Sequence, residues 1–292
     1  SAVAETITQL VIRGLSDTSG GEATSQNVSV FLDGVYVQNS AALDLGLGGI
    51  ERVEVVKGPV SGLYGRNAFT GAVNYVTSNP TNTFHADLAL TGGDKGRFIA
   101  EGDVSGALVK DLLKVKVAGT YDYLQGTFHD PVSGEYGNGH RKRDVMLTVV
   151  FTPASNVTIK PVFYYGHDNF TSPATTIYSQ SCAYGTSNSQ CGDIAASAIG
   201  SFIAKPYASG ATGNTRDVTH VHVDAKVDGS WGTFSALLGY NHITTKTINE
   251  FSGTENGSAY ALYKVGANNP FAGSPTFGTA NLTAYFGFGG LE

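Results

Sequence analysis

Apolar and polar residues alternate along several segments beyond Pro80, and this period of two most limits the folds open to the chain. In "LLKVKVAGTYDY" (112–123), valines, tyrosines and a leucine fall on one side, while lysines, a threonine and an aspartate fall on the other. Segments 97–108 and 215–227 repeat this pattern, and related alternation occurs in Phe84–Leu90, Asp144–Phe151, Val157–Asp168 and Phe234–Thr244. Because successive side chains of a β-strand point to opposite faces, the pattern predicts a mainly β fold.

The connections between these segments are sorted by length. After the first hairpin, long links at 125–142, 170–214 and 252–280 alternate with the short links "VKD", "TPASN" and "DGSWG". Outer-membrane barrels have tight turns at one rim and large loops at the other, whereas a sandwich has no reason to sort its loops. The sequence therefore predicts about eight antiparallel barrel strands, with Leu282–Phe288 as the eighth.

The composition excludes further classes of protein. Charged residues make up only 14% of the 292 residues, and the net charge is −6. No basic stripe accompanies this acidic balance, which argues against a nucleic-acid partner. Arg141-Lys142-Arg143 is the one basic run, and we interpret it as a solvated loop. No apolar run reaches about 18 residues, so a transmembrane helix is excluded, while barrel strands remain possible.

The first part of the chain contains the glycine-punctuated segment "IERVEVVKGPVSGLYGRNAFTGAVNYVTSNP", residues 50–80. It lacks the phosphate-binding glycine patterns and the G-x-S-x-G elbow of hydrolases, so a compact β-turn unit is the expected structure. Short β-runs are predicted at Gln9–Arg13, Val28–Val37, Arg52–Val56 and Ala72–Thr77.

Three motifs carry a resemblance to a known family: "VIRG" at 11–14, "VSVFLDGVYV" at 28–37, and the whole of segment 50–80. Together they resemble the TonB-dependent outer-membrane receptors, in which a small α/β plug sits inside an antiparallel barrel of about 22 strands. The resemblance implies a plug at residues 1–80 and the N-terminal part of the barrel at 81–292, in a Gram-negative outer membrane. The TonB box, the first plug residues and the remaining strands are expected to lie outside this sequence.

The resemblance also implies a function. Receptors of this family take up scarce nutrients, most often ferric siderophores, with cobalamin, haem and oligosaccharides as the alternatives. The implied partners are the TonB energy-coupling complex, the small ligand and outer-membrane lipid. Two other classes stay open, a passive porin and a secreted β-rich adhesin, although a porin has no reason to carry the motif of residues 50–80.

The same resemblance assigns site residues. The outward plug loops would bind substrate through Arg13, Gln38, Asn39 and Ser40. Anchoring of the plug to acidic groups of the barrel wall would use the charged residues Arg52, Glu54, Lys57 and Arg66. Glycines for turns and close backbone approach are expected at Gly14, Gly34, Gly58, Gly65 and Gly71.

Two further pairs stand out. Cys182 and Cys191 lie in the longest predicted link, where they could close a disulfide loop. His220 and His222 share one strand face, either as lumen-lining polar residues or as a metal pair that lacks a third ligand. No nucleophile–base set or paired carboxylates emerge, so we expect neither catalysis nor a cofactor or metal.

Overall fold

In the computed structural model the strands form two main sheets and one two-stranded extension. The described residues are 28–37, 49–58, 70–129, 136–171, 213–248 and, for the backbone, 276–289. A four-stranded sheet, which we call the small sheet, precedes an eight-stranded sheet, which we call the large sheet. No α-helix occurs in these ranges.

The small sheet has the strand order β2-β1-β4-β3. Its strands are β1 (Val28–Leu32), β2 (Val35–Val37), β3 (Ile50–Lys57) and β4 (Gly71–Thr77). β1 pairs in parallel with β4, whereas the β1–β2 and β3–β4 pairs are antiparallel. All five β1 residues are buried, which agrees with the inner position of this strand and its mainly apolar sequence.

The prediction of a single β-run over Val28–Val37 was wrong. The chain reverses at Asp33-Gly34, where both residues have positive φ angles of 48° and 82°. Positive φ at both central residues defines the type I′ hairpin turn, for which Asp-Gly is a preferred pair. The apolar residues on either side therefore form two short strands, and the turn places Asp33 at the tip of a hairpin.

The large sheet is an antiparallel meander in the order β14-β13-β12-β11-β10-β7-β6-β5. Its eight strands confirm the number expected from the alternation, and the predicted eighth lies within β14. The bounds are β5 (His85–Gly92), β6 (Phe98–Val109), β7 (Leu113–Leu124), β10 (His140–Ala154), β11 (Val157–Thr171), β12 (Gly213–Gly229), β13 (Gly232–Ile248) and β14 (Thr276–Gly289).

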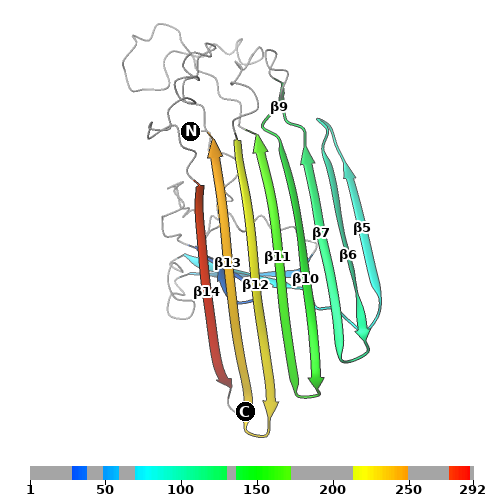
Figure 1. The fold of residues 1–292 in the computed structure, drawn as a ribbon, viewed down its shortest axis with the longest axis vertical. Helices are drawn as coiled ribbons and strands as arrows, with labels where there is room; N and C mark the ends of the chain where they lie inside the picture. Colours follow the sequence, from blue (N-terminus) through cyan, green and yellow to red (C-terminus); the bar gives the residue numbers. More distant parts are fainter. Residues whose placement is uncertain are drawn as a thin grey trace.

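The two rims of the large sheet differ (Figure 1). The β6–β7, β10–β11 and β12–β13 turns lie at one rim, which we call the turn rim. The longer connections leave the opposite, loop rim. There β8 (Phe128–His129) and β9 (Tyr136–Gly137) form a two-stranded extension between β7 and β10.

The interpretation of Arg141-Lys142-Arg143 as a solvated loop was wrong, because these residues lie inside β10. They are paired on one side with β7 and on the other with β11. The strand was predicted to begin at Asp144. Because the backbone is paired on both sides from His140 onward, β10 begins earlier and includes the basic run.

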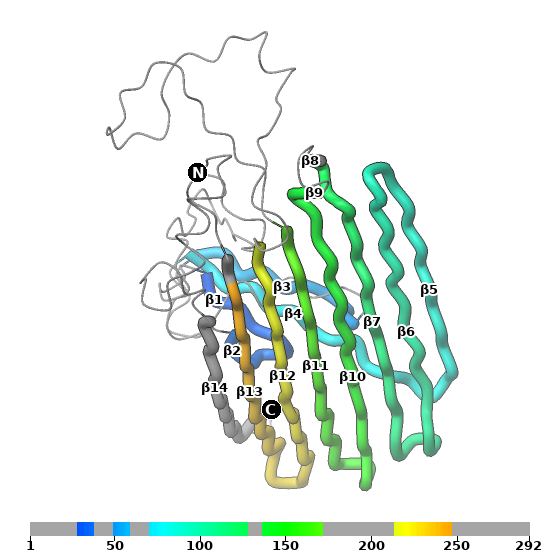
Figure 2. The backbone as a smooth tube through the Cα atoms, turned by 45° about the horizontal axis from the view of Figure 1, so that its top comes forward, coloured from blue at the N-terminus to red at the C-terminus, as the bar shows by residue number. Residues whose placement is uncertain are grey.

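The small sheet lies behind the large sheet in Figure 1 and crosses its strands, as Figure 2 also shows. A shared core joins the two: Val30, Leu32 and Val37 of the small sheet pack with Met146, Val162, Tyr164, Val218 and Ile243 of the large sheet. We call the face of the large sheet that contacts the small sheet its inner face.

The outer face of the large sheet is apolar. Exposed large apolar side chains on it include Leu88, Val117, Phe163, Leu238 and Tyr240. The alternation in 215–227 is oriented as expected, since His220 and His222 are buried on the inner face while the valines between and after them point outward. Within the described ranges no helix is long and apolar enough to cross a membrane, a finding without bearing on membrane strands.

Candidate functional site

Asp33, at the tip of the β1–β2 hairpin, is the centre of the most connected polar site between the two sheets. Within the small sheet its Oδ1 accepts a hydrogen bond from the Thr77 backbone N–H at 2.8 Å, and its Oδ2 accepts one from the Thr77 hydroxyl. The Asp33 backbone N–H donates to the Tyr75 carbonyl at 2.8 Å. These bonds fix the carboxylate at the end of β4 and direct it toward the large sheet.

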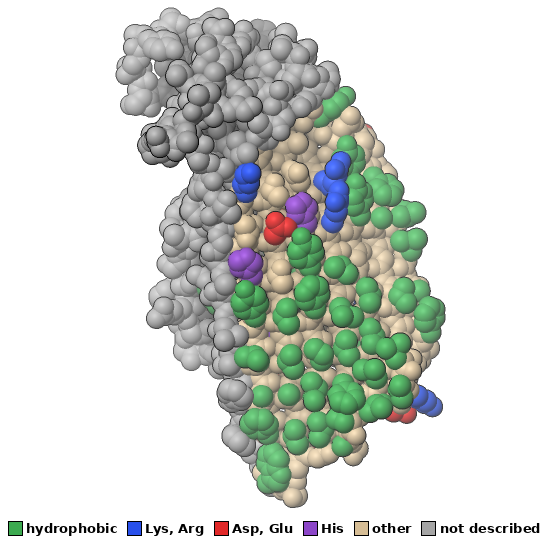
Figure 3. Space-filling view, viewed as in Figure 1, with side chains coloured by type: hydrophobic (Ala, Val, Ile, Leu, Met, Phe, Trp, Pro, Cys, Tyr) green, Lys and Arg blue, Asp and Glu red, His purple; other side chains and the backbone are tan. Residues whose placement is uncertain are grey.

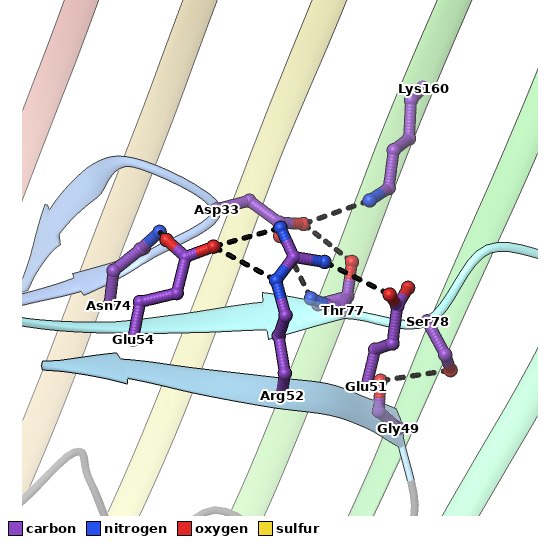
Figure 4. Close-up of polar contacts among 9 residues, drawn as sticks. All are labelled: Asp33, Gly49, Glu51, Arg52, Glu54, Asn74, Thr77, Ser78 and Lys160. Carbon is purple, nitrogen blue, oxygen red and sulfur yellow. Dashed lines mark hydrogen bonds and ion pairs between the residues drawn. The ribbon is translucent and has the colours of Figure 1, made fainter.

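Two side chains of the large sheet meet this carboxylate. Lys160 Nζ on β11 and His222 Nε2 on β12 each lie 3.2 Å from Asp33 Oδ2. Figure 4 shows the Lys160 side chain reaching from its strand to Asp33, with Thr77 on the other side. The His222 side chain is fully buried, and only 9% of the Asp33 side chain is exposed. The contact is therefore an ion pair largely withdrawn from water.

The network continues along the inner face. His222 Nδ1 lies 2.8 Å from His220 Nε2, and His220 Nδ1 is hydrogen bonded to Asn241 Oδ1 on β13. The Asn241 amide N–H then donates to the Tyr36 carbonyl of β2 at 3.0 Å. We call Asp33, Lys160, His222, His220 and Asn241 the junction network, and it ties the hairpin to three neighbouring strands.

The hydrogen-bond pattern assigns the protons of the two histidines. Asn241 Oδ1 can only accept, so His220 carries its proton on Nδ1 and accepts at Nε2 from His222 Nδ1–H. The other ring nitrogen of His222, Nε2, faces the Asp33 carboxylate.

Burial alone would raise the pKa of the Asp33 carboxyl group. The hydrogen bond from His222, the ammonium group of Lys160 and the Thr77 hydroxyl act in the opposite direction. Together they outweigh burial and hold the pKa of Asp33 well below its usual range. The carboxylate thus stays ionised at any physiological pH, and the junction keeps its charge.

Close packing surrounds the polar contacts. A Cβ atom added at Gly239 of β13 would lie 2.9 Å from Val35 Cγ2 and 3.2 Å from Val35 Cβ. Gly49, just before β3, is similarly close to the Met146 side chain of β10. Glycine at these two positions lets the small sheet come close to the large sheet.

The predicted anchoring residues have other neighbours. Arg52 pairs with Glu51 at 2.9 Å and with Glu54 at 2.8 Å, and all three are about half exposed (Figure 4). Glu54 also accepts from Asn74 at 3.0 Å, and this bond, followed by Arg52, lowers the pKa of Glu54. Lys57 is exposed. The proposal that Arg52, Glu54 and Lys57 contact an acidic wall stays a prediction.

Of the predicted turn glycines, Gly34 completes the hairpin turn, and Gly58 has a φ of 108° directly after β3. Gly71 begins β4. The remaining predicted residues lie outside the described part of the chain: Arg13, Gly14, Gln38, Asn39, Ser40, Gly65, Arg66, Cys182 and Cys191.

Sequence reasoning missed Asp33 and Lys160. The signal for Asp33 was the Asp-Gly pair inside "VSVFLDGVYV", which predicts a hairpin tip. The two histidines, predicted to line the lumen, are buried on the inner face of the large sheet, beneath the hairpin. Among the described residues no group of three His, Cys, Asp or Glu side chains could hold a metal ion.

Parts of the chain are similar to known proteins. Residues 2–72 match the family described as TonB-dependent Receptor Plug Domain. The chain is 32% identical over 120 residues to the vitamin B12 transporter BtuB of Vibrio vulnificus, covering 39% of this chain and 20% of that protein. It is 26% identical over 168 residues to the ferrichrome outer membrane transporter/phage receptor of Escherichia coli, covering 56% and 20%. The chain thus spans about a fifth of these relatives.

Several solved structures of outer-membrane receptors have a fold similar to that of this chain. The ferric yersiniabactin uptake receptor FyuA of Yersinia pestis superposes with a TM-score of 0.65 at 17% identity, over 83% of this chain and 35% of that one. The siderophore receptor PiuA of Acinetobacter baumannii gives a TM-score of 0.60 at 14% identity, over 82% and 31%. At these identities the likeness concerns the fold, a small sheet against one part of a barrel wall.

Proposed function

We propose that this chain, which is part of a TonB-dependent receptor of the Gram-negative outer membrane, takes part in the active uptake of a scarce nutrient. In this proposal the small sheet belongs to the plug that closes the barrel, and the large sheet is one section of the barrel wall. The outer membrane has no supply of ATP, so uptake against a gradient needs energy from TonB.

The junction network carries the proposal. A passive pore needs no domain fastened to its inner wall, whereas a gated receptor needs a plug that is held in place and then released. The contacts of Asp33 with Lys160 and His222 fasten the hairpin at one carboxylate. Together with the shared apolar core, these contacts hold the hairpin against the large sheet.

A ferric siderophore is the substrate that we favour. Support comes from the ferrichrome transporter among the sequence relatives and from the siderophore receptors that share the fold. The match to vitamin B12 transporters at 32% and 31% identity favours cobalamin as the second candidate. Both ligands are metal complexes too large for diffusion through ordinary porins.

Uptake assays separate these candidates. The receptor that carries this chain is expressed in cells lacking their own siderophore and cobalamin receptors, which are then supplied with radiolabelled ferric siderophores or labelled cobalamin. We expect accumulation of iron that is lost when TonB is deleted. Accumulation of cobalamin alone would replace the siderophore proposal, and TonB-independent accumulation of both would contradict active uptake.

A further inference from the structure

The outer face of the large sheet changes character near the loop rim. Two rows of laterally paired residues cross it there. One row runs Tyr123, Arg141, Asn169, Thr215 and Lys246, and the next runs Tyr121, Arg143, His167, Asp217 and Thr244. Paired neighbours in a sheet share one face, so these side chains form a continuous polar belt, which we call the basic belt.

The charges of the basic belt are mainly positive. Arg141, Arg143 and Lys246 are exposed, and within the described ranges no carboxylate pairs with any of them. Arg141 lies over the Tyr123 ring, 5.4 Å from its centroid. The one carboxylate of the two rows, Asp217, already pairs with His167 at 2.8 Å and accepts from the Tyr165 hydroxyl at 3.0 Å. Three cations are therefore open to an external anion.

An apolar surface adjoins the basic belt on its turn-rim side. Beyond one intervening row that contains Val145 and Tyr165, a lateral row of apolar side chains crosses the sheet: Val117, Leu147, Phe163 and Val221. In Figure 3 the Lys, Arg and His side chains gather above a broad field of hydrophobic ones. Tyr121 and Tyr123 within the basic belt and Tyr165 in the next row occupy the place of the aromatic girdle that marks a membrane interface in outer-membrane barrels.

The face thus has an apolar field for acyl chains, an aromatic boundary and open cations at headgroup height. From this order we infer that the basic belt binds the phosphate groups of an outer-leaflet glycolipid, with the acyl chains of the same molecule lying on the apolar field. Guanidinium groups suit this ligand, because their planar donors match phosphate oxygens. The site is separate from the junction network, which lies on the opposite face of the same sheet.

The inner face of β10 supplies a matched comparison. Lys142 stands between Arg141 and Arg143 in sequence but points the other way, with its Nζ 5.4 Å from the centroid of the buried Phe170 ring. Replacing Lys142 removes the same charge at the same height without touching the basic belt.

Lipid retention by the purified receptor that carries this chain tests the inference. The detergent-solubilised receptor is mixed with lipid A bearing its phosphates or with enzymatically dephosphorylated lipid A, and bound lipid is measured by native mass spectrometry. We expect the phosphorylated form to be retained preferentially. Loss of one cation should weaken lipid retention about fivefold. The double variant Arg141→Gln/Arg143→Gln should therefore weaken it about 25-fold. Lys142→Gln should retain lipid like the wild type.

Several outcomes would overturn the inference. These are equal retention of dephosphorylated lipid, unchanged retention by the double Arg variant, or an equal loss in Lys142→Gln. Inorganic phosphate at the same concentration should not displace the lipid, and displacement would mean that the basic belt binds the free anion instead. Heat-modifiable migration in electrophoresis verifies that each variant is folded, so a loss of retention reports on the belt.

Discussion

At the scale of single residues, the junction rests on Asp33. Its carboxylate compensates the Lys160 ammonium and meets His222, so its removal leaves a nearly buried cation without a counter-charge. Breaking such a pair is costly because the remaining charge stays desolvated. By contrast, the exposed pair of Glu51 and Arg52 is well solvated, and exposed pairs contribute little.

A double-mutant cycle on Asp33 and Lys160 measures this difference. We expect Asp33→Asn to destabilise the hairpin by about 2–3 kcal/mol, and the cycle with Lys160→Met to give a coupling of about 1–2 kcal/mol. Hydrogen exchange of the amides in 28–37 reports the local opening free energy. Glu51→Gln is the control and should change it by less than about 0.5 kcal/mol. A coupling near zero would show that the two charges act independently.

The low pKa of Asp33 predicts a pH dependence with a definite sign. A carboxyl group whose pKa is lower in the folded state stabilises that state fully above its unfolded pKa, about 3.9, and loses this effect as the pH falls further. The stability difference between wild type and Asp33→Asn should therefore be constant from neutral pH to about pH 5 and shrink below about pH 4. Hydrogen exchange corrected for intrinsic rates gives this difference. A decline that begins near neutral pH would show that the Asp33 carboxyl group is not the group whose titration controls this stability.

At the scale of elements, β2 packs closely on β13 because Gly239 has no side chain and leaves room for Val35. Alanine there would bring a Cβ within 3.2 Å of Val35 Cβ, and Val35 is fully buried. We expect Gly239→Ala to cost about 1–3 kcal/mol through overpacking, measured by the same exchange of residues 28–37. Gly92→Ala is the control, because an added Cβ would meet nothing within 4 Å. Val35→Ala combined with Gly239→Ala should recover part of the loss, and an unaffected hairpin in Gly239→Ala would contradict the close fit.

The elements of the large sheet were largely predictable from the sequence, whereas the junction was not. Residues Leu113–Tyr123 and 215–227 alternate because one face of each strand is apolar and the other is polar. The sequence of each strand shows this pattern by itself. The pairing of Asp33 with Lys160 and His222 joins residues far apart in sequence, and no local pattern encodes it. Arg141–Arg143 was misassigned because charge suggested a loop, while pairing with β7 and β11 continued the strand.

At the scale of the whole molecule, the proposed function requires that the hairpin leave the wall during uptake. Cysteines at positions 35 and 239 would have Cβ atoms about as close as a disulfide needs, since the added Cβ lies 3.2 Å from Val35 Cβ and typical values start near 3.5 Å. We expect Val35→Cys with Gly239→Cys to form a bond that leaves ligand binding intact and stops uptake. Reduction should restore uptake. Each single cysteine variant is the control, and undiminished uptake by the oxidised protein would mean that the hairpin stays on the wall throughout transport.

The position of β1 within the small sheet has a mechanical consequence. Tension applied to the chain ahead of Val28 would run along β1, which is held by β4 in parallel register over five residue pairs and by β2 on its other side. Such a geometry loads the ladder in shear, so its hydrogen bonds bear the load together rather than one after another. The load path then passes through the turn to Asp33, whose contacts with Lys160 and His222 join the tip of the hairpin to the large sheet, beside the shared apolar core. Tension would therefore pass through the paired strands of the small sheet to the hairpin tip, where the contacts of Asp33 would bear it.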